Sequence, residues 1–148
     1  MIRYEAGGWG VGELWLEDGV PVWHELPRPA ADAATSRHPL AKRMARYFAG
    51  VRDSFEDVPL DLDWCTPFQR AVAETLRRVP YGETVTYGEL AALAGYPNAQ
   101  RAAGSFCAGN RLPLIVPCHR VVSAAGLGQY GSLGVEYKRR LLELEGAL

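Results

Sequence analysis

Residues 85–110, "VTYGELAALAGYPNAQRAAGSFCAGN", decide which fold we expect for the second half of the chain. The segment up to Gly95 has the composition of a short helix, and a glycine at its end is a common C-terminal stop. Pro97 and Asn98 signal a turn, and another helix is expected from about Ala99 to Ala108. Two short helices joined by a tight turn predict a helix-turn-helix unit.

The second of these helices has unusually small side chains around Arg101. Gly104 costs about 1 kcal/mol in a helix interior, so a close approach to another molecule would explain it. Small residues suit the narrow minor groove of DNA, whereas a major-groove helix normally carries several long polar side chains. Arg101 would then be a probe into the DNA. The alternative is that the small residues only allow tight helix packing.

Residues 66–79, "TPFQRAVAETLRRV", predict a preceding helix with Thr66 as N-cap and Pro67 at the first helical position. "PYG" at residues 80–82 ends this helix. Apolar residues recur along it at helical spacing: Phe68, Val72, Leu76 and Val79.

The first half of the chain has a different pattern. Residues 12–26, "GELWLEDGVPVWHEL", alternate around Asp18-Gly19 and predict a β-hairpin. Residues 38–50, "HPLAKRMARYFAG", predict a helix, and residues 54–64 are expected to be extended. The whole pattern predicts an α/β (α+β) protein. Its N-terminal sheet-plus-helix domain would span 1–62, and a mainly helical domain with a winged-helix-like helix-turn-helix would span 63–148.

The chain of 148 residues is 48% hydrophobic and 22% charged, which is typical of a globular protein. No apolar run approaches the length of a membrane span, and the N-terminus, "MIRYEAGGWG", lacks the layout of a signal peptide. We therefore expect no membrane partner and a cytoplasmic protein, or a nuclear one in a eukaryote.

Charge is divided unevenly along the chain. Residues 1–63 carry seven Lys and Arg against eleven Asp and Glu, whereas residues 64–148 carry nine against six. Residues 98–135 contain no acidic residue but include Arg101, Arg111 and Arg120, as a surface that faces a polyanion requires. We expect these arginines to bind DNA. A buried, charge-poor segment would give the same pattern.

Residues 115–122, "IVPCHRVV", place Cys118 beside His119 after an apolar stretch that we expect to be a strand. Adjacent residues do not share a face of a helix or strand, so a turn or a water molecule would have to connect the two side chains. The other cysteines, Cys65 and Cys107, form no CxxC spacing, which argues against a disulfide framework or a zinc site. Both are interpreted as packing residues.

The motifs "VTYGELAALAG", "RAAGSF", "GN" and "LPLIVPCHRVV" together resemble the O6-alkylguanine-DNA alkyltransferase family (methylated-DNA–protein-cysteine methyltransferase). The similarity runs from Thr66 to Gly146, more than half of the chain. It implies DNA repair by direct damage reversal. The alkyl group of O6-alkylguanine, and of O4-alkylthymine, would move irreversibly to a cysteine of a protein that acts once, as a monomer and without metal or organic cofactor.

The resemblance also implies roles for individual residues. Cys118 matches the alkyl acceptor, His119 its base, and Glu145 the carboxylate that orients the imidazole. Tyr87 matches the donor to guanine N3, and Asn110 the residue that braces the active-site turn. The expected pocket residues are Tyr130 and Val121.

The damaged nucleotide would be flipped out of the DNA stack. Arg101 matches the arginine that fills the vacated space, and Ala102, Ala103 and Gly104 would form the face in contact with the minor groove. Two features depart from the family pattern: Arg111 replaces a proline, and residues 131–133 differ from the usual lid.

Three other functions remain to be weighed. A non-catalytic protein that binds alkylated bases and signals damage would commonly have tryptophan in place of Cys118. A helix-turn-helix transcription regulator would leave the cysteine, histidine and glutamate idle. A cysteine hydrolase would need an oxyanion arrangement, which the sequence does not display.

Overall fold

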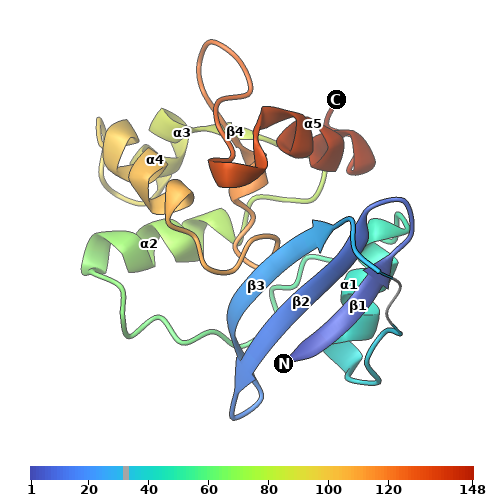
Figure 1. The fold of residues 1–148 in the computed structure, drawn as a ribbon. Helices are drawn as coiled ribbons and strands as arrows, with labels where there is room; N and C mark the ends of the chain where they lie inside the picture. Colours follow the sequence, from blue (N-terminus) through green and yellow to red (C-terminus); the bar gives the residue numbers. More distant parts are fainter. Residues whose placement is uncertain (32–33) are drawn as a thin grey trace. The chain divides into compact units, whose positions relative to one another are not determined.

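The computed structural model describes residues 1–31 and 34–148 (Figure 1). Its internal contacts divide the chain into two compact units. The first comprises Met1–Asp61 and the short segment Arg111–Pro113, and the second comprises Leu62–Asn110 and Leu114–Leu148. The division into domains of 1–62 and 63–148 stays a prediction.

The first unit contains a three-stranded antiparallel sheet in the order β1-β2-β3. Its strands are β1 (Ile2–Ala6), β2 (Gly10–Glu17) and β3 (Val20–Arg28). Asp18 and Gly19 join β2 to β3 with φ values of 51° and 78°. Two consecutive positive φ values are typical of the tight turn that matches strand twist, so the predicted hairpin is confirmed.

Helix α1 (Pro39–Phe48) covers one face of this sheet (Figure 1). His38 caps it by accepting a hydrogen bond from the Leu40 backbone N–H, which confirms the predicted helix. Tyr4 of β1 stacks on Phe48 of α1 with ring centroids 6.0 Å apart, and this contact lies in the core of the unit.

The segment of residues 54–64, predicted to be extended, contains turns and no strand. The Asp53 carboxylate accepts a hydrogen bond from the Phe55 N–H, and Phe55 itself has a φ of 54°. Val58 then donates to the Phe55 carbonyl. A side chain that bonds the backbone two residues ahead favours a turn over a strand, which explains the difference.

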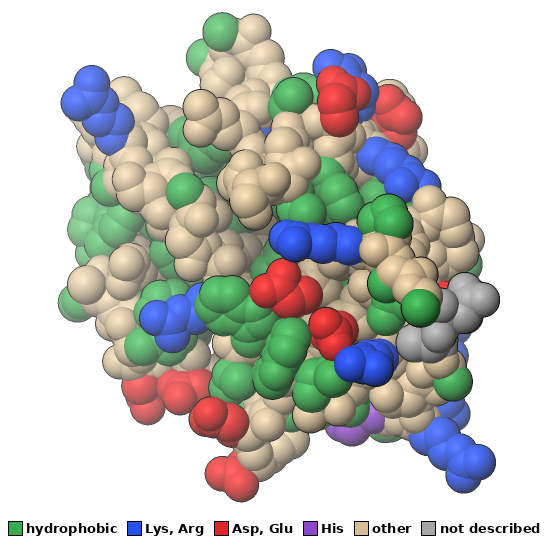
Figure 2. All heavy atoms as spheres, in the orientation of Figure 1, with side chains coloured by type: hydrophobic (Ala, Val, Ile, Leu, Met, Phe, Trp, Pro, Cys, Tyr) green, Lys and Arg blue, Asp and Glu red, His purple; other side chains and the backbone are tan. Residues whose placement is uncertain are grey.

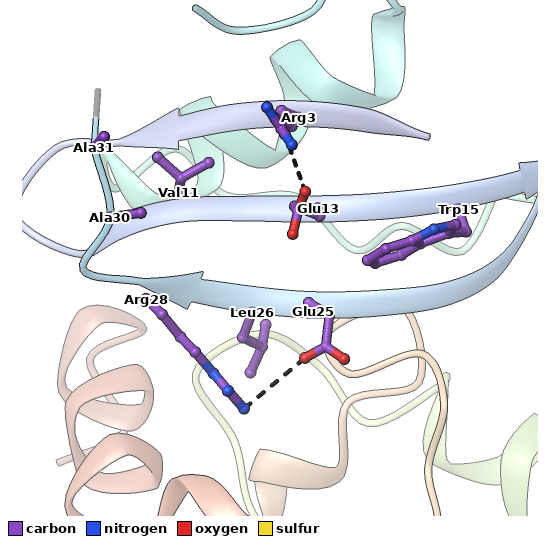
Figure 3. Close-up of a pocket in the computed structure, with 9 residues that line it drawn as sticks. All are labelled: Arg3, Val11, Glu13, Trp15, Glu25, Leu26, Arg28, Ala30 and Ala31. Atoms are coloured by element: carbon purple, nitrogen blue, oxygen red, sulfur yellow. Dashed lines mark hydrogen bonds and ion pairs between the residues drawn. The ribbon is translucent and has the colours of Figure 1, made fainter. Parts of the chain in front are cut away.

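A pocket of about 600 Å³ lies on the face of the sheet opposite α1 (Figure 3). Its arginines are paired with carboxylates of the same face: Arg3 with Glu13 at 3.0 Å and Arg28 with Glu25 at 3.9 Å. The lining has no cysteine or histidine and consists of Arg3, Val11, Glu13, Trp15, Glu25, Leu26, Arg28, Ala30 and Ala31.

The second unit is mainly helical. Its helices are α2 (Pro67–Leu76), α3 (Tyr87–Leu93), α4 (Gln100–Ala108) and α5 (Val135–Leu144), with 3-10 turns at Cys118–Arg120 and Gly131–Leu133. Thr66 and Thr86 each form a reciprocal capping box, with Gln69 and Glu89 respectively. These caps fix where α2 and α3 begin, and all the helices predicted in residues 66–108 are confirmed.

Helices α3 and α4 pack against each other, and the turn between them contains Asn98 at a φ of 68°. The structure therefore has the mixed α/β class and the pair of short helices that the sequence predicts. The resemblance to a winged helix stays a prediction.

The apolar stretch before Cys118 is not a strand, so this prediction is wrong. Leu114 has a φ of 74°, which reverses the chain and breaks the alternation of a strand. Its neighbours Ile115 and Val116 are nevertheless buried in the core. The regular pairing here is short and parallel: Val85 of β4 (Val85–Thr86) pairs with Val121 of β5 (Val121–Val122).

Candidate active site

Cys118 lies in a turn that is fixed on both sides. Its N–H donates to the Val116 carbonyl at 2.8 Å, and Pro117 between them has φ −81° and ψ 66°. These values are those of an inverse γ-turn, which the fixed φ of proline favours. Three residues later, β5 begins at Val121. The thiol is therefore held between a proline turn and a strand, with a relative exposure of 3%.

Asn110 holds this turn from inside. Its Nδ2 donates to the Val116 carbonyl at 2.8 Å and to the Cys118 Sγ at 3.2 Å. The amide thus links the backbone of the turn to the sulfur atom. Burial raises the pKa of Cys118, and the donation from Asn110 opposes this rise because it favours the thiolate form.

His119 is completely buried and bonds to Glu145. Its Nε2 lies 2.7 Å from Glu145 Oε2. An ionised carboxylate can only accept hydrogen bonds, so Nε2 carries the proton and Nδ1 has a free lone pair. Nothing in residues 1–31 and 34–148 hydrogen-bonds to that Nδ1. The imidazole therefore has one atom free to accept a proton.

Arg120 anchors the same carboxylate. Its Nε and Nη2 donate to the two oxygens of Glu145 at 2.9 and 3.0 Å, and its Nη1 donates to the Val79 carbonyl at 2.9 Å. Burial by itself would raise the pKa of Glu145, but the hydrogen bonds from His119 and Arg120 hold it well below its usual value. Glu145 is therefore ionised throughout the neutral range.

The buried environment makes both the acid and the base neutral. Burial lowers the pKa of His119, which Glu145 partly offsets, and the charges of Arg120 and Lys138 lower it further. Burial also raises the pKa of Cys118 well above its usual value, and contact with Cys107 adds to this. The resting pair is thus a thiol next to a neutral imidazole, which suits transfer of a proton at the moment of reaction.

A pocket of about 580 Å³ opens onto Cys118. One wall is Tyr87 at the start of α3, whose pKa is raised to about 12, mainly by burial. Gly128, at φ 78°, lies so close that a Cβ there would be 3.3 Å from the Tyr87 hydroxyl. The full lining is Tyr87, Arg101, Gly104, Ser105, Cys107, Ala108, Cys118, Ser123, Gly128, Gln129, Tyr130 and Gly131.

No group of three or more His, Cys, Asp and Glu side chains in the described part of the chain is arranged to hold a metal ion. Within the same residues, no helix is both long enough and apolar enough to cross a membrane.

Comparison with known proteins identifies the family. The model of the DNA-binding domain of 6-O-methylguanine DNA methyltransferase matches residues 67–147. A protein of Metallosphaera sedula named methylated-DNA–protein-cysteine methyltransferase is 45% identical, over 100% of this chain and 96% of its own length. This chain belongs to the 6-O-methylguanine DNA methyltransferase family.

Two further relatives agree with this assignment. A methylated-DNA–protein-cysteine methyltransferase of Methanopyrus kandleri is 46% identical, over 81% of this chain and 88% of its own. A crystal structure of Mycobacterium tuberculosis OGT in complex with DNA superposes with a TM-score of 0.80 at 35% identity, covering 98% and 91% of the two chains. Both the sequence and the fold of this chain are therefore those of the methyltransferase family.

The structure brings together the five residues that the sequence analysis called catalytic. Glu145 reaches His119, Asn110 reaches Cys118, and Tyr87 lines the pocket with Cys118. Tyr130 lines the same pocket, and within the described residues its buried hydroxyl has no hydrogen-bond partner. The roles assigned to these residues stay predictions.

Three of the predicted contact residues are placed differently from the expectation. Arg120 is 2% exposed and its guanidinium is bonded to Glu145, so it cannot face DNA. Ala103 is completely buried and faces the core of the unit. Val121 is also completely buried; it pairs with Val85 in the parallel ladder and is not part of the pocket lining. Charge and small size in the sequence do not reveal burial.

The remaining predicted DNA contacts are accessible. Arg101 and Ala102 are exposed on α4, Gly104 is half-buried, and Arg111 is exposed. Figure 2 shows the visible surface over α4 with a basic side chain and without an acidic one. This agrees with the acid-free stretch of sequence. Contact of these residues with DNA stays a prediction.

Lys138 of α5 is a site residue that the sequence analysis missed. It is completely buried, its Nζ donates to the Gln129 carbonyl at 3.2 Å, and it lies 5.7 Å from the centroid of the Tyr87 ring. Its charge opposes the rise in the pKa of Cys118 that burial causes. A signal was present, because Lys138 and Glu145 occupy the same helical stripe as the buried residues Leu141 and Leu142.

Cys107 also differs from the expectation. The sequence predicts a packing residue, but Cys107 lines the pocket together with Cys118 and adds to the rise in the pKa of Cys118 that burial causes. The sequence separates the two cysteines by eleven positions, and nothing in that spacing shows that the end of α4 meets the Cys118 turn.

Proposed function

We propose that this protein repairs alkylated DNA by transferring the alkyl group from guanine O6 to its own Cys118. The observation that carries the proposal is the buried set of Cys118, His119 and Glu145 at a pocket large enough for a base. Membership of the methyltransferase family and the DNA complex of a relative at 35% identity support it.

The first chemical need is removal of the thiol proton. His119 Nδ1 is the free acceptor, and it takes the proton of Cys118 directly or through one water molecule. The imidazolium that forms is stabilised by Glu145, whose position Arg120 fixes through two hydrogen bonds. Asn110 and Lys138 stabilise the negative charge on the sulfur at the same time.

The second need is a leaving group that can depart. As the bond between Cys118 Sγ and the alkyl carbon forms, the bond from that carbon to O6 breaks, and guanine accumulates negative charge. Tyr87 donates a hydrogen bond to guanine N3 from the pocket wall, so it stabilises that charge. Its raised pKa keeps the hydroxyl protonated in the resting state.

A base inside duplex DNA cannot reach a pocket of this kind unless it leaves the stack. Helix α4 lies in the minor groove, and Arg101 fills the space of the flipped nucleotide. The exposure of Arg101 and Ala102 and the pocket lining by Gly104 support this arrangement. Arg111 adds a further basic contact.

The product is a thioether, which water does not cleave, so each molecule acts once. The same chemistry applies to O4-alkylthymine. We place the monomeric protein in the cytoplasm, or in the nucleus of a eukaryote, where its DNA substrate is found.

The test is stoichiometric transfer to a defined peptide. The protein is incubated with an oligonucleotide containing O6-methylguanine and digested with trypsin, and the peptides are analysed by mass spectrometry. One methyl group is expected on the peptide of residues 112–120, which contains Cys118, with saturation at one per molecule.

Cys118→Ala should lose transfer and still bind the lesion, whereas Cys65→Ala is the matched control and should transfer normally. Retarded DNA with an unmodified Cys118 peptide would instead assign the protein to the non-catalytic lesion-binding proteins. Transfer by Cys118→Ala would overturn the assignment of the acceptor.

A further inference from the structure

The alkyl pocket contains a second thiol that the transfer reaction does not use. Cys107 is half-buried on the last turn of α4 and lines the pocket together with Cys118. The proximity of Cys107 also contributes to the raised pKa of Cys118, after burial. The third cysteine, Cys65, is not part of this lining.

Asn110 fixes both cysteines to one point of the chain. Its backbone N–H donates to the Cys107 carbonyl at 3.2 Å, and its side chain donates to the Cys118 Sγ at 3.2 Å. The same amide also bonds the Val116 carbonyl. Asn110 therefore ties the end of α4, which carries Cys107, to the turn that carries Cys118.

We propose that Cys107 and Cys118 are a redox modification site that closes to a disulfide when hydrogen peroxide enters the pocket. The Cys118 sulfur attacks the peroxide O–O bond, which yields a sulfenic acid on Cys118 and water. The Cys107 sulfur then attacks that sulfenic sulfur, the S–O bond breaks, and a second water leaves with the Cys107 proton. The peroxide gains two electrons and the two thiols lose them.

The geometry favours closure over further oxidation. A sulfenic acid condenses with a neighbouring thiol, whereas an isolated one proceeds to the irreversible sulfinic acid. Bond formation requires the two sulfur atoms, which line one pocket, to approach to about 2.05 Å. The disulfide form cannot accept an alkyl group until a dithiol reduces it.

The site goes beyond the proposed repair reaction, because bond formation needs only the two thiols and not alkyl transfer. The sequence also offers a direct assay. Trypsin cuts after Arg101, Arg111 and Arg120, so Cys107 and Cys118 fall on separate peptides, residues 102–111 and 112–120.

The experiment treats the full-length protein with hydrogen peroxide, blocks free thiols with N-ethylmaleimide and analyses a non-reducing tryptic digest by mass spectrometry. We expect these two peptides to be joined, and dithiothreitol to separate them and to restore methyl transfer. Unlinked peptides in the treated wild type, or Cys118 joined to Cys65, would overturn the proposal.

Cys107→Ser is the decisive variant, and Cys65→Ser is its matched control. After peroxide, Cys107→Ser should carry a sulfinic acid on Cys118 and should not regain methyl transfer in dithiothreitol. Cys65→Ser should behave as the wild type. Equal recovery of transfer in Cys107→Ser and wild type would rule out the role of Cys107, and circular dichroism verifies that the variant is folded.

Discussion

The two units of the molecule each contain a buried histidine, and only one of them has a free nitrogen. In the first unit, His24 lies 2.6 Å from the Tyr4 hydroxyl through Nε2 and 2.7 Å from the Pro113 carbonyl through Nδ1. In the second unit, His119 bonds Glu145 through Nε2, and its Nδ1 has no partner in the described residues. Burial lowers the pKa of both. A lowered pKa therefore does not distinguish the two histidines. The reactive site differs because His119 has a ring nitrogen free to accept a proton and follows a cysteine in the chain.

Substitution of each histidine by asparagine is the strongest test of this comparison. His119→Asn removes the proton acceptor, so the single-turnover rate of methyl transfer should fall by about 10²–10⁴-fold, the usual contribution of a general base. His24→Asn should change the rate per folded molecule far less and should lower stability. Similar rate losses in the two variants would contradict the distinction.

The next largest effect is the contribution of His24 to the pH dependence of the protein's stability. Burial lowers its pKa from 6.5 to about 4, so the unfolded chain binds a proton more readily than the folded one. Stability is therefore complete above about pH 6.5 and is lost as the pH falls towards 4, by roughly 3 kcal/mol in all.

Urea unfolding of the wild type and His24→Gln between pH 7 and pH 4 measures this loss. The variant should have a flatter dependence on pH over this window, because glutamine does not titrate. Parallel curves for the two proteins would show that His24 is not the group responsible.

Lys138 extends the comparison to a second buried polar group. Both ring nitrogens of His24 have hydrogen-bond partners, whereas the charge of Lys138 acts on the Cys118 thiol. This charge opposes the rise in the pKa of Cys118 that burial causes, so Lys138→Met should raise that pKa further and move the rise of the transfer rate to higher pH. One pKa unit would reduce the rate near neutral pH by roughly tenfold. The pH profile is measured beside Arg139→Met, an exposed neighbour on α5, whose profile should match the wild type.

Two arginines allow the same contrast for DNA binding, since Arg101 is exposed and Arg120 is buried. Arg101→Ala should slow repair of duplex DNA by about tenfold, equivalent to roughly 1.4 kcal/mol, and leave reaction with free O6-benzylguanine nearly unchanged. Gln100→Ala, on the same turn of α4, is the control. If Arg101→Ala lost the same fraction of its transfer rate with duplex DNA and with free O6-benzylguanine, Arg101 would have no role in flipping the nucleotide.

Features governed by neighbours in sequence were predictable. Thr66 and Pro67 mark the start of α2 by local capping chemistry, and Asp18-Gly19 marks the hairpin by its backbone preferences. Features governed by distant contacts were not. The positive φ of Leu114 was not predictable, because the apolar run around it equally suits a strand. The burial of Arg120 was not predictable, because the acid-free segment around it equally suits an exposed surface.

The site itself was partly accessible from the sequence. The family motif supplied Cys118, His119 and Glu145, but it did not show that Arg120 holds Glu145 or that Cys107 and Cys118 line one pocket. These pairings depend on where α4, α5 and the Cys118 turn meet in space. Helical periodicity on α5 was the one unused signal, and it would have identified Lys138 as a buried charge.

The contact between Gly128 and Tyr87 has a consequence for attempts to broaden the range of alkyl groups that the protein accepts. At position 128 the backbone itself limits the pocket, because even a single added methyl group would press on the Tyr87 ring and would also strain a left-handed residue. Enlargement from this side is therefore blocked, since there is no side chain to trim. Engineering for bulkier groups has to begin where the lining has side chains to change, at Ser105 and Cys107 of α4.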